Sequence, residues 1–406
     1  MTKVNKPKIR FKKFKDSWSM RKLSDTQTDF KDGNYGEAYP KETDFTSSTQ
    51  GIPFLRGSDL DNGKLTLTNA RYITQSKHNE LVSGHLIEDD IVIAVRGSLG
   101  SLGYVRPDCV GWNINSQLAI IRTRKIELAG KYLIQFLLSI RGNKEILSHI
   151  TGTALKQLPI KQLKNIKVPI PKLIEQTAIG SLFRTLDDLL ASYKDNLANY
   201  QSLKATMLSK MFPKAGQTVP EIRLDGFEGE WEEKQFSKLV KRVTQSSDSD
   251  SLPKVEFEDI ISGQGRLNKD ISSKFDNRKG IHFKPGYTLY GKLRPYLNNW
   301  LLPKFEGVAL GDFWVFDPNG NDSNFIYYLV QSDRYQKVAN DTSGTKMPRS
   351  DWKSVSSTIF AIPQTVAEQQ AIGAYFSNLD NLINSHQEKI SQLETLKKKL
   401  LQDMFI

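Results

Sequence analysis

The chain has 406 residues, a formal net charge of +12 and a pI of about 9.4. Hydrophobic residues make up 38% and charged residues 25%, which excludes a disordered chain and allows two or more packed domains. The positive charge favours polyanionic partners, most often nucleic acid, although a basic protein without such a partner could have the same composition.

The first predicted feature is a basic arm from Lys3 to Lys15, which contains no acidic residue before Asp16. Such an arm could contact phosphates or simply be solvated. No run of about 18 apolar residues occurs anywhere, so we expect no membrane-spanning helix. Cys109 is the only cysteine and cannot form an internal disulfide, which fits a reducing cytoplasm and predicts an inert core thiol.

A mixed segment follows, in which short β-rich runs alternate with Gly, Pro, Asn and Asp. The run Ile91–Val95 predicts a buried strand, and 131–139 predicts a short helix. In several loops Arg or Lys meets glycine and a hydroxyl group. Glycine lets the backbone approach phosphates, and arginine can bond to guanine edges. Each loop could also be an ordinary surface turn. The candidate DNA-binding residues here are Arg56, Ser58, Arg96, Ser98, Thr153 and Lys156.

The next element is a long helix with a regular apolar seam, preceded by Pro171 and ended by Pro213. Its apolar residues alternate steps of four and three, the 3.5-residue period of a coiled coil. The predicted pairing residues are Ile179, Phe183, Leu186, Leu190 and Leu197.

The second half repeats the first. The opening around Phe14 and Trp18 recurs around Phe227 and Trp231, and Thr151-Gly152-Thr153 recurs as Ser343-Gly344-Thr345. Residues 175–212 align without gaps with residues 368–405, with 15 identities in 38 positions. The pairing residues of the second helix are Ile372, Phe376, Leu379, Ile383 and Ile390. The DNA-binding candidates of this half are Lys292, Arg294, Tyr296, Asn298, Thr345, Lys346 and Arg349.

Two long apolar seams in one chain should be buried against each other. The alternative is that each helix packs on its own globular domain; pairing is favoured because the seam lasts five turns, longer than a small domain needs.

Familiar catalytic motifs are missing from the sequence. We find no phosphate-binding loop, no Cys-x-x-Cys or His-Glu-x-x-His metal motif, and no Asn-Pro-Pro-aromatic motif of an amino-methyltransferase. The five histidines are scattered without ligand spacing, so no catalytic residue and no metal ligand is assigned.

The chain resembles the specificity subunits of type I restriction–modification systems over essentially its whole length. The resemblance rests on the stretch Ile170–Ile179, its repeat Ile362–Ile372, the segment Lys292–Leu297 and the paired openings. Each Pro…Glu-Gln entry to a long helix follows a variable module; the second entry has one residue more.

The resemblance implies an α/β (α+β) fold: two target recognition domains with twisted mixed β-sheets, and two long antiparallel coiled-coil helices related by a pseudo-two-fold repeat. The expected boundaries are 1–165 for the first recognition domain, 166–215 for a central helical spacer, 216–357 for the second domain and 358–406 for a C-terminal spacer.

The resemblance also implies a non-catalytic, cytoplasmic protein that binds a bipartite, asymmetric double-stranded DNA target. Two methyltransferase subunits would methylate adenine, and motor-nuclease restriction subunits would join them. S-adenosylmethionine, ATP and Mg would belong to those partners, with no cofactor in this chain. A helix of 38 residues is about 57 Å long, and half-sites on one face lie roughly 34 Å apart, so the helices could space the domains. Four residues inserted in one seam should then lengthen the DNA spacer.

Two alternatives remain at this stage. The chain could be a self-sufficient DNA-modifying or DNA-cleaving enzyme with an unfamiliar active site, or a coiled-coil scaffold without a DNA role. Turnover by the isolated chain would indicate the first, and the absence of salt-dependent DNA binding would indicate the second.

Overall fold

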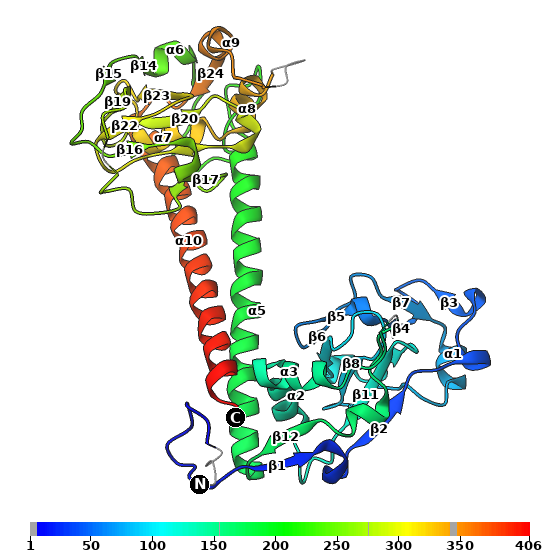
Figure 1. The fold of residues 1–406 in the computed structure, drawn as a ribbon. Helices are drawn as coiled ribbons and strands as arrows, with labels where there is room; N and C mark the ends of the chain where they lie inside the picture. Colours follow the sequence, from blue (N-terminus) through cyan, green and yellow to red (C-terminus); the bar gives the residue numbers. More distant parts are fainter. Residues whose placement is uncertain (1–5, 154, 275, 342–346) are drawn as a thin grey trace. The chain divides into compact units, whose positions relative to one another are not determined.

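The computed structural model of the protein describes residues 6–153, 155–274, 276–341 and 347–406. The chain forms two compact units: Met1–Tyr193 together with Lys389–Ile406, called unit 1, and Lys194–Glu388, called unit 2. Each unit holds one globular module and the adjoining parts of both long helices (Figure 1). The units therefore divide the chain within the helices, whereas the expected boundaries separate modules from helices.

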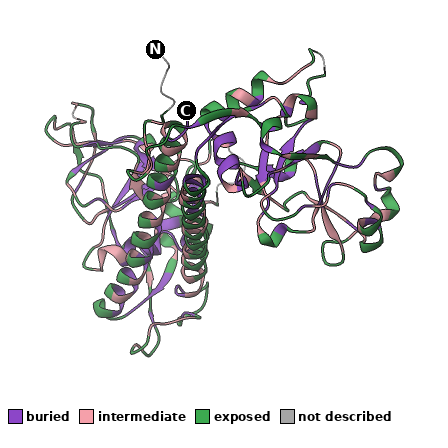
Figure 2. Cartoon of the chain, turned by 90° about the horizontal axis from the view of Figure 1, so that it is seen from below, coloured by how far each residue is buried: buried purple, intermediate pink, exposed green. Residues whose placement is uncertain are grey.

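Unit 1 is built on an antiparallel sheet whose central strands are buried on both faces. Ile91 and Ile93 of β8 (Ile91–Ala94) face one core with the helices, and Val92 and Ala94 face a second core, as the two-residue period of a strand requires. Figure 2 shows buried residues concentrated in the sheets and exposed residues along the outer helix faces. In order across the sheet, the strands are β2 (Asp29–Asp32), β11 (Leu118–Arg122), β8 (Ile91–Ala94) and β9 (Leu102–Tyr104).

A second, smaller sheet and several short elements complete unit 1. The second sheet has the order β10 (Asn113–Ile114), β4 (Ile52–Leu55), β7 (Arg71–Ile73) and β3 (Phe45–Thr46). The two-stranded pairs are β5 (Leu60–Asp61) with β6 (Lys64–Leu65), and β1 (Ser19–Lys22) with β12 (Lys167–Ile170). The short helices are α1 (Gln75–Glu80), α2 (Gly130–Leu138), α3 (Ile140–Ser148) and α4 (Ile160–Leu163).

Unit 2 repeats the main sheet of unit 1 with the same strand order and all-antiparallel pairing. Its strands are β14 (Lys241–Val243), β23 (Phe313–Asp317), β20 (Thr288–Gly291) and β21 (Trp300–Leu301). The pair β13 (Glu232–Gln235) and β24 (Ile359–Ile362) matches β1 and β12. The short helices are α6 (Phe236–Leu239), α7 (Ser323–Leu329), α8 (Asp333–Ala339) and α9 (Trp352–Ser357).

The second sheets of the two units differ. In unit 2 the order is β15 (Ser246–Ser247), β19 (Gly280–Phe283), β22 (Gly307–Ala309) and β16 (Lys254–Val255). The strands β17 (Ile260–Ile261) and β18 (Arg266–Leu267) form a separate two-stranded hairpin. Here β22 joins the parallel pair to the rest of the sheet, whereas in unit 1 the strand at that place is β4. The two modules therefore share a main sheet and vary in the layer that covers it.

The long helices are α5 (Leu173–Lys210) and α10 (Val366–Asp403), each of 38 residues. Each begins with a buried glutamate that is held by an arginine and a tryptophan. In unit 1, Arg10 Nε donates to Glu175 at 2.6 Å and Trp18 Nε1 donates to the same carboxylate at 3.3 Å. The hydrogen bond to Glu175 raises the pKa of Arg10, against the opposing effect of burial. The sequence repeat therefore reflects a repeated buried clamp.

Unit 2 forms the same clamp, in which Arg223 Nε donates to Glu368 at 2.7 Å and Trp231 Nε1 donates at 3.1 Å. The pKa of Arg223 is raised by its hydrogen bond to Glu368, again against burial. Each clamp ties the start of a long helix to the segment that opens its module.

Within each unit the two helices run antiparallel. In unit 1, Asp187 of α5 pairs with Lys397 of α10 at 2.5 Å, and Phe183 stacks on Phe405, with ring centroids 6.1 Å apart. From the first contact to the second, the residue number falls from 187 to 183 in the first segment and rises from 397 to 405 in the second, so the two run antiparallel.

Unit 2 contains the matching contacts. Lys204 pairs with Asp380 at 2.7 Å, and Phe212 stacks on Phe376 at 6.0 Å. Each residue in these contacts of unit 2 is offset by 193 positions from its counterpart in unit 1, and the two helices exchange roles.

The predicted seam residues lie at two depths. In both units the residues nearest each helix start are buried and join the core of their own module, together with the end of the other long helix. The seam therefore packs on a module and on a helix at once. The buried residues are Ile179, Phe183, Leu186, Leu190, Ile372, Phe376, Leu379 and Ile383, and the half-buried ones are Leu197 and Ile390.

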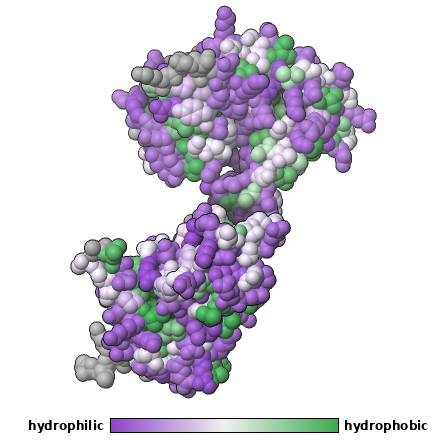
Figure 3. Space-filling model, turned by 90° about the vertical axis from the view of Figure 1, so that its right-hand side faces the viewer, coloured by the Kyte–Doolittle hydropathy of each residue, from purple (hydrophilic) through white to green (hydrophobic). Residues whose placement is uncertain are grey.

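No helix in the described part of the chain is both long enough and apolar enough to span a membrane. The face shown in Figure 3 is mostly hydrophilic, with apolar side chains in small groups.

Candidate nucleic-acid interface

Two of the predicted loops in unit 1 lie against each other. The first follows β4 and carries Arg56 and Ser58, and the second follows β8 and carries Arg96 and Ser98. A Cβ atom at Gly57 would lie only 3.7 Å from Ser98 Oγ, so the loops are in contact there. The structure thus brings together residues that are about 40 positions apart in the sequence.

A third loop joins this cluster. Thr151 and Gln157 form an isolated β-bridge, and the Leu158 N–H donates to the Val95 carbonyl oxygen at 3.0 Å. The tip of this loop carries Thr153 and Lys156, which are both exposed. The second and third loops are therefore fixed to one another by a backbone hydrogen bond.

The two candidate arginines of unit 1, Arg56 and Arg96, differ in how many of their donors bond to the protein itself. Arg56 Nη2 donates to the Asn69 carbonyl oxygen, and its backbone N–H donates to the buried Asp59 carboxylate at 2.7 Å. Much of Arg56 is therefore committed to holding the loop. Arg96 is exposed, with one donor on the Ser116 carbonyl oxygen at 2.9 Å and its guanidinium 5.2 Å from the Tyr35 ring centre. It keeps other donors free, as a DNA contact would need.

In unit 2 the corresponding loops are joined in the same manner. The Ser350 N–H donates to the Lys292 carbonyl oxygen at 2.9 Å, and Leu293 and Arg349 form a β-bridge. Lys292 and Arg349 both pair with Asp312, at 3.6 and 3.1 Å. Asp312 thus neutralises part of the positive charge that these two residues contribute.

The segment after β20 presents three predicted side chains. Arg294 and Asn298 have φ values of 48° and 55°, a left-handed conformation that is uncommon for residues other than glycine. Arg294 is exposed, Tyr296 is 57% exposed and Asn298 is half-buried. Backbone hydrogen bonds hold the segment, from the Arg294 N–H to Pro348 at 2.7 Å and from the Gly263 N–H to Asn298 at 3.0 Å. The remaining predicted residues, Thr345 and Lys346, lie outside the described residues.

The comparisons with known proteins agree with this architecture. A family model for the type I restriction modification DNA specificity domain matches residues 16–199 and 253–395. The chain belongs to this family.

Relatives of this specificity subunit cover different shares of it. A protein named as the MjaX specificity subunit of a type I restriction enzyme, from Methanocaldococcus jannaschii, is 22% identical over 95% of this chain and 92% of that protein. The EcoBI specificity subunit of Escherichia coli is 27% identical over 40% of this chain and 35% of its own length. The crystal structure of a type I S subunit from M. genitalium has the same fold, with a TM-score of 0.65, 15% identity and 99% of each chain covered.

The structure of the specificity subunit also shows an acidic loop that the pattern of a basic residue beside glycine does not predict. In unit 2 the loop that corresponds to Arg56–Asp59 is Glu256–Asp259. The Glu256 N–H donates to Asp259 at 2.8 Å, as Arg56 does to Asp59, and a short hairpin follows in both units. The spacing of the aspartate and the next glycine, Asp59 to Gly63 and Asp259 to Gly263, is the sequence signal that could have revealed it.

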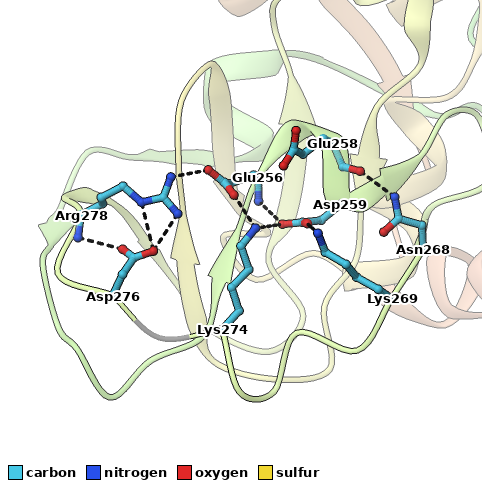
Figure 4. A network of polar contacts seen from close by, with 8 residues as sticks. All are labelled: Glu256, Glu258, Asp259, Asn268, Lys269, Lys274, Asp276 and Arg278. Carbon is cyan, nitrogen blue, oxygen red and sulfur yellow. Dashed lines mark hydrogen bonds and ion pairs between the residues drawn. The ribbon is translucent and has the colours of Figure 1, made fainter.

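Most of the negative charge of this acidic loop is neutralised within unit 2 (Figure 4). Glu256 pairs with Arg278 and Lys274. The hydrogen bond to Arg278, and after it the one to Lys274, hold the pKa of Glu256 below its ordinary value. Asp259 pairs with Lys269 at 2.8 Å and Lys274 at 2.7 Å. Burial raises the pKa of Asp259, but these bonds outweigh it and the net shift is downward.

Oxygens of Glu256, Glu258 and Asp259 lie within 4.8 Å of one another, a grouping that could accept a metal ion. Two of these three carboxylates already bind ammonium or guanidinium groups. The described geometry is that of a neutralised loop, and no metal role is assigned to it.

Proposed function

We propose that this specificity subunit binds a bipartite, asymmetric DNA target, with one recognition domain on each half-site. The observation that carries the proposal is the recurrence of one loop framework with different side chains. The hydrogen bond from Leu158 to Val95 recurs as that from Ser350 to Lys292, while the first loop changes from Arg56 and Ser58 to Glu256 and Glu258. One framework with two sets of side chains supports two different half-sites.

The proposal extends to the partners of the chain. In this proposal the chain directs two kinds of partner to the bound sequence in the cytoplasm. The methyltransferase subunits methylate adenine and supply S-adenosylmethionine, and the restriction subunits use ATP and Mg. The matching contacts Asp187–Lys397 and Lys204–Asp380 support two equivalent docking positions, because each unit presents the same helix pair. The chain itself would hold no cofactor and perform no catalysis.

Mapping the bases that are methylated by the complex of this chain with its methyltransferase subunits tests the proposal. We expect a single split sequence whose two halves differ. Methylation confined to continuous sites, or two identical half-sites, would contradict it. The candidate phosphate contacts, Lys156 among them, predict that binding weakens steeply as salt rises.

The alternative of a self-sufficient enzyme predicts turnover by the chain alone. Incubation of the isolated chain with DNA and either S-adenosylmethionine or Mg²⁺ separates the two functions. Methylation or cleavage under those conditions would favour the enzyme.

A further inference from the structure

The tip of the first loop carries opposite chemistry in the two units. Ser58 occupies it in unit 1 and Glu258 in unit 2, each one residue before the buried aspartate that caps the loop. The loop backbones have the same capping geometry, so the residue at the tip can change without changing its support. A position that varies on a constant support is suited to a role in specificity.

Glu258 is the carboxylate of this loop that the protein does not neutralise. Glu256 and Asp259 are paired with Lys269, Lys274 and Arg278, and their carboxylates face these groups. An oxygen of the Glu258 carboxylate lies within 4.8 Å of oxygens of Glu256 and Asp259, but the carboxylate makes no hydrogen bond or ion pair with any residue that the structure describes (Figure 4). Only its backbone carbonyl oxygen is used, as the acceptor of Asn268 Nδ2 at 2.6 Å. The side chain is therefore exposed, charged and free to bind.

Glu258 lies beside the loops that form the candidate interface. It lines a groove of about 800 Å³ together with Phe257, Arg278, Leu293 and Asp312. Leu293 belongs to the segment that presents Lys292 and Arg294. A Cβ atom at Gly291 would lie 2.5 Å from the Phe257 ring, so the acidic loop packs directly on the start of that segment.

A free carboxylate on a DNA-binding surface is unfavourable next to phosphates, since like charges repel. It is favourable where it meets a hydrogen-bond donor on a base edge. In the major groove the exposed donors are the amino groups of cytosine and adenine, and carboxylates suit cytosine N4. Adenine places the acceptor N7 beside its amino group, where it would face the second carboxylate oxygen.

We propose that Glu258 determines specificity for cytosine in the half-site bound by unit 2, by accepting a hydrogen bond from the N4 amino group. This inference rests on the proposed function and assigns one residue within it. The corresponding tip of unit 1, Ser58, has no charge and makes no such selection.

The test is selection of bound duplexes from a pool with randomised half-sites, using the complex of the full chain with its methyltransferase subunits. Glu258→Gln should move the preference at one position from cytosine to adenine, because an amide can both accept from N6 and donate to N7. Glu258→Ser should relax the preference for cytosine about tenfold without introducing a new base. The other half-site should not change in either variant.

Glu233→Gln is the matched control, because Glu233 is an exposed glutamate on β13 and its loss removes the same charge. It should leave both half-sites unchanged. An equal gain in affinity of Glu258→Gln for all sequences would overturn the inference, since it would mean simple phosphate repulsion. A cytosine preference that disappears with EDTA would also overturn it, by making Glu258 a cation ligand. Absence of any sequence preference in the unsubstituted complex would instead contradict the proposed function.

Discussion

Glu256 is the residue whose ion pairs should make unit 2 sensitive to acid. Its bonds to Arg278 and Lys274 lower its pKa from the ordinary value of 4.5. A carboxylate with a lowered folded-state pKa stabilises the fold above its unfolded pKa, and this stability is lost as the pH falls through the folded pKa.

We therefore expect Glu256→Gln to destabilise the fold by about 1 kcal/mol at pH 7, a modest value because Arg278 is half-exposed. The difference from the unsubstituted chain should shrink as the pH falls below 4.5 and through the lowered pKa of Glu256. Urea unfolding over a series of pH values from 7 downward measures it, and a loss that stays constant across the series would contradict the assignment.

Cys109 should be unreactive in the folded chain. Burial and the neighbouring Asp108 carboxylate raise the pKa of its thiol from 9.0 to about 11. Since the thiolate is the nucleophile, reaction with Ellman's reagent at pH 8 should be about a hundred times slower in the native chain than in urea. Because this is the only cysteine, the absorbance reports one site, and equal rates would contradict the prediction.

At the residue scale, sequence reasoning found positions more reliably than roles. Arg56 and Arg96 were both predicted from a basic residue beside glycine, but only the structure shows that Arg56 holds its own loop while Arg96 stays exposed. A basic residue beside glycine does not predict the acidic loop, because residue type is what differs between the two modules at that loop.

At the scale of elements, Gly373 allows α10 to approach α7 closely. A Cβ atom there would lie 2.7 Å from Asn324 Cβ and 2.8 Å from Asp322 Oδ1, and Asp322 caps α7. Alanine normally stabilises a helix relative to glycine by up to about 1 kcal/mol, but overpacking costs about 1–3 kcal/mol.

We expect Gly373→Ala to be destabilising by about 1–2 kcal/mol and to speed amide hydrogen exchange in α7. Ser385→Ala, at an exposed position of the same helix, is the control and should be neutral or slightly stabilising. Stabilisation by Gly373→Ala would contradict the prediction, because it would show that α10 and α7 can move apart without a loss of stability.

The elements divide clearly into those that periodicity predicts and those that it does not. The 3.5-residue seam predicted both long helices, and the apolar run Ile91–Val95 predicted β8, because each pattern repeats often enough to exceed chance. The second sheets could not be predicted. Several of their strands have two residues, such as β15 and β16, too few to show any period, and their pairing depends on contacts distant in sequence.

At the scale of the whole molecule, the helices supply a means of testing the proposed spacing of half-sites. Unit 1 pairs Asp187 with Lys397, and unit 2 pairs Lys204 with Asp380. On each helix the two paired positions are the same number of residues apart, from 187 to 204 and from 380 to 397. Equal insertions in both helices between these positions therefore keep both of these ion pairs in register.

One added heptad in each helix preserves the apolar seam and lengthens both helices by about 10.5 Å. If the helices set the spacing of the half-sites, the methylated sequence should gain about three base pairs between its halves, with both halves unchanged. The same residues inserted after Lys214, outside α5, are the control and should leave the spacer as it was. A spacer that stays constant in the lengthened chain would mean that the recognition domains find their half-sites independently of the helices.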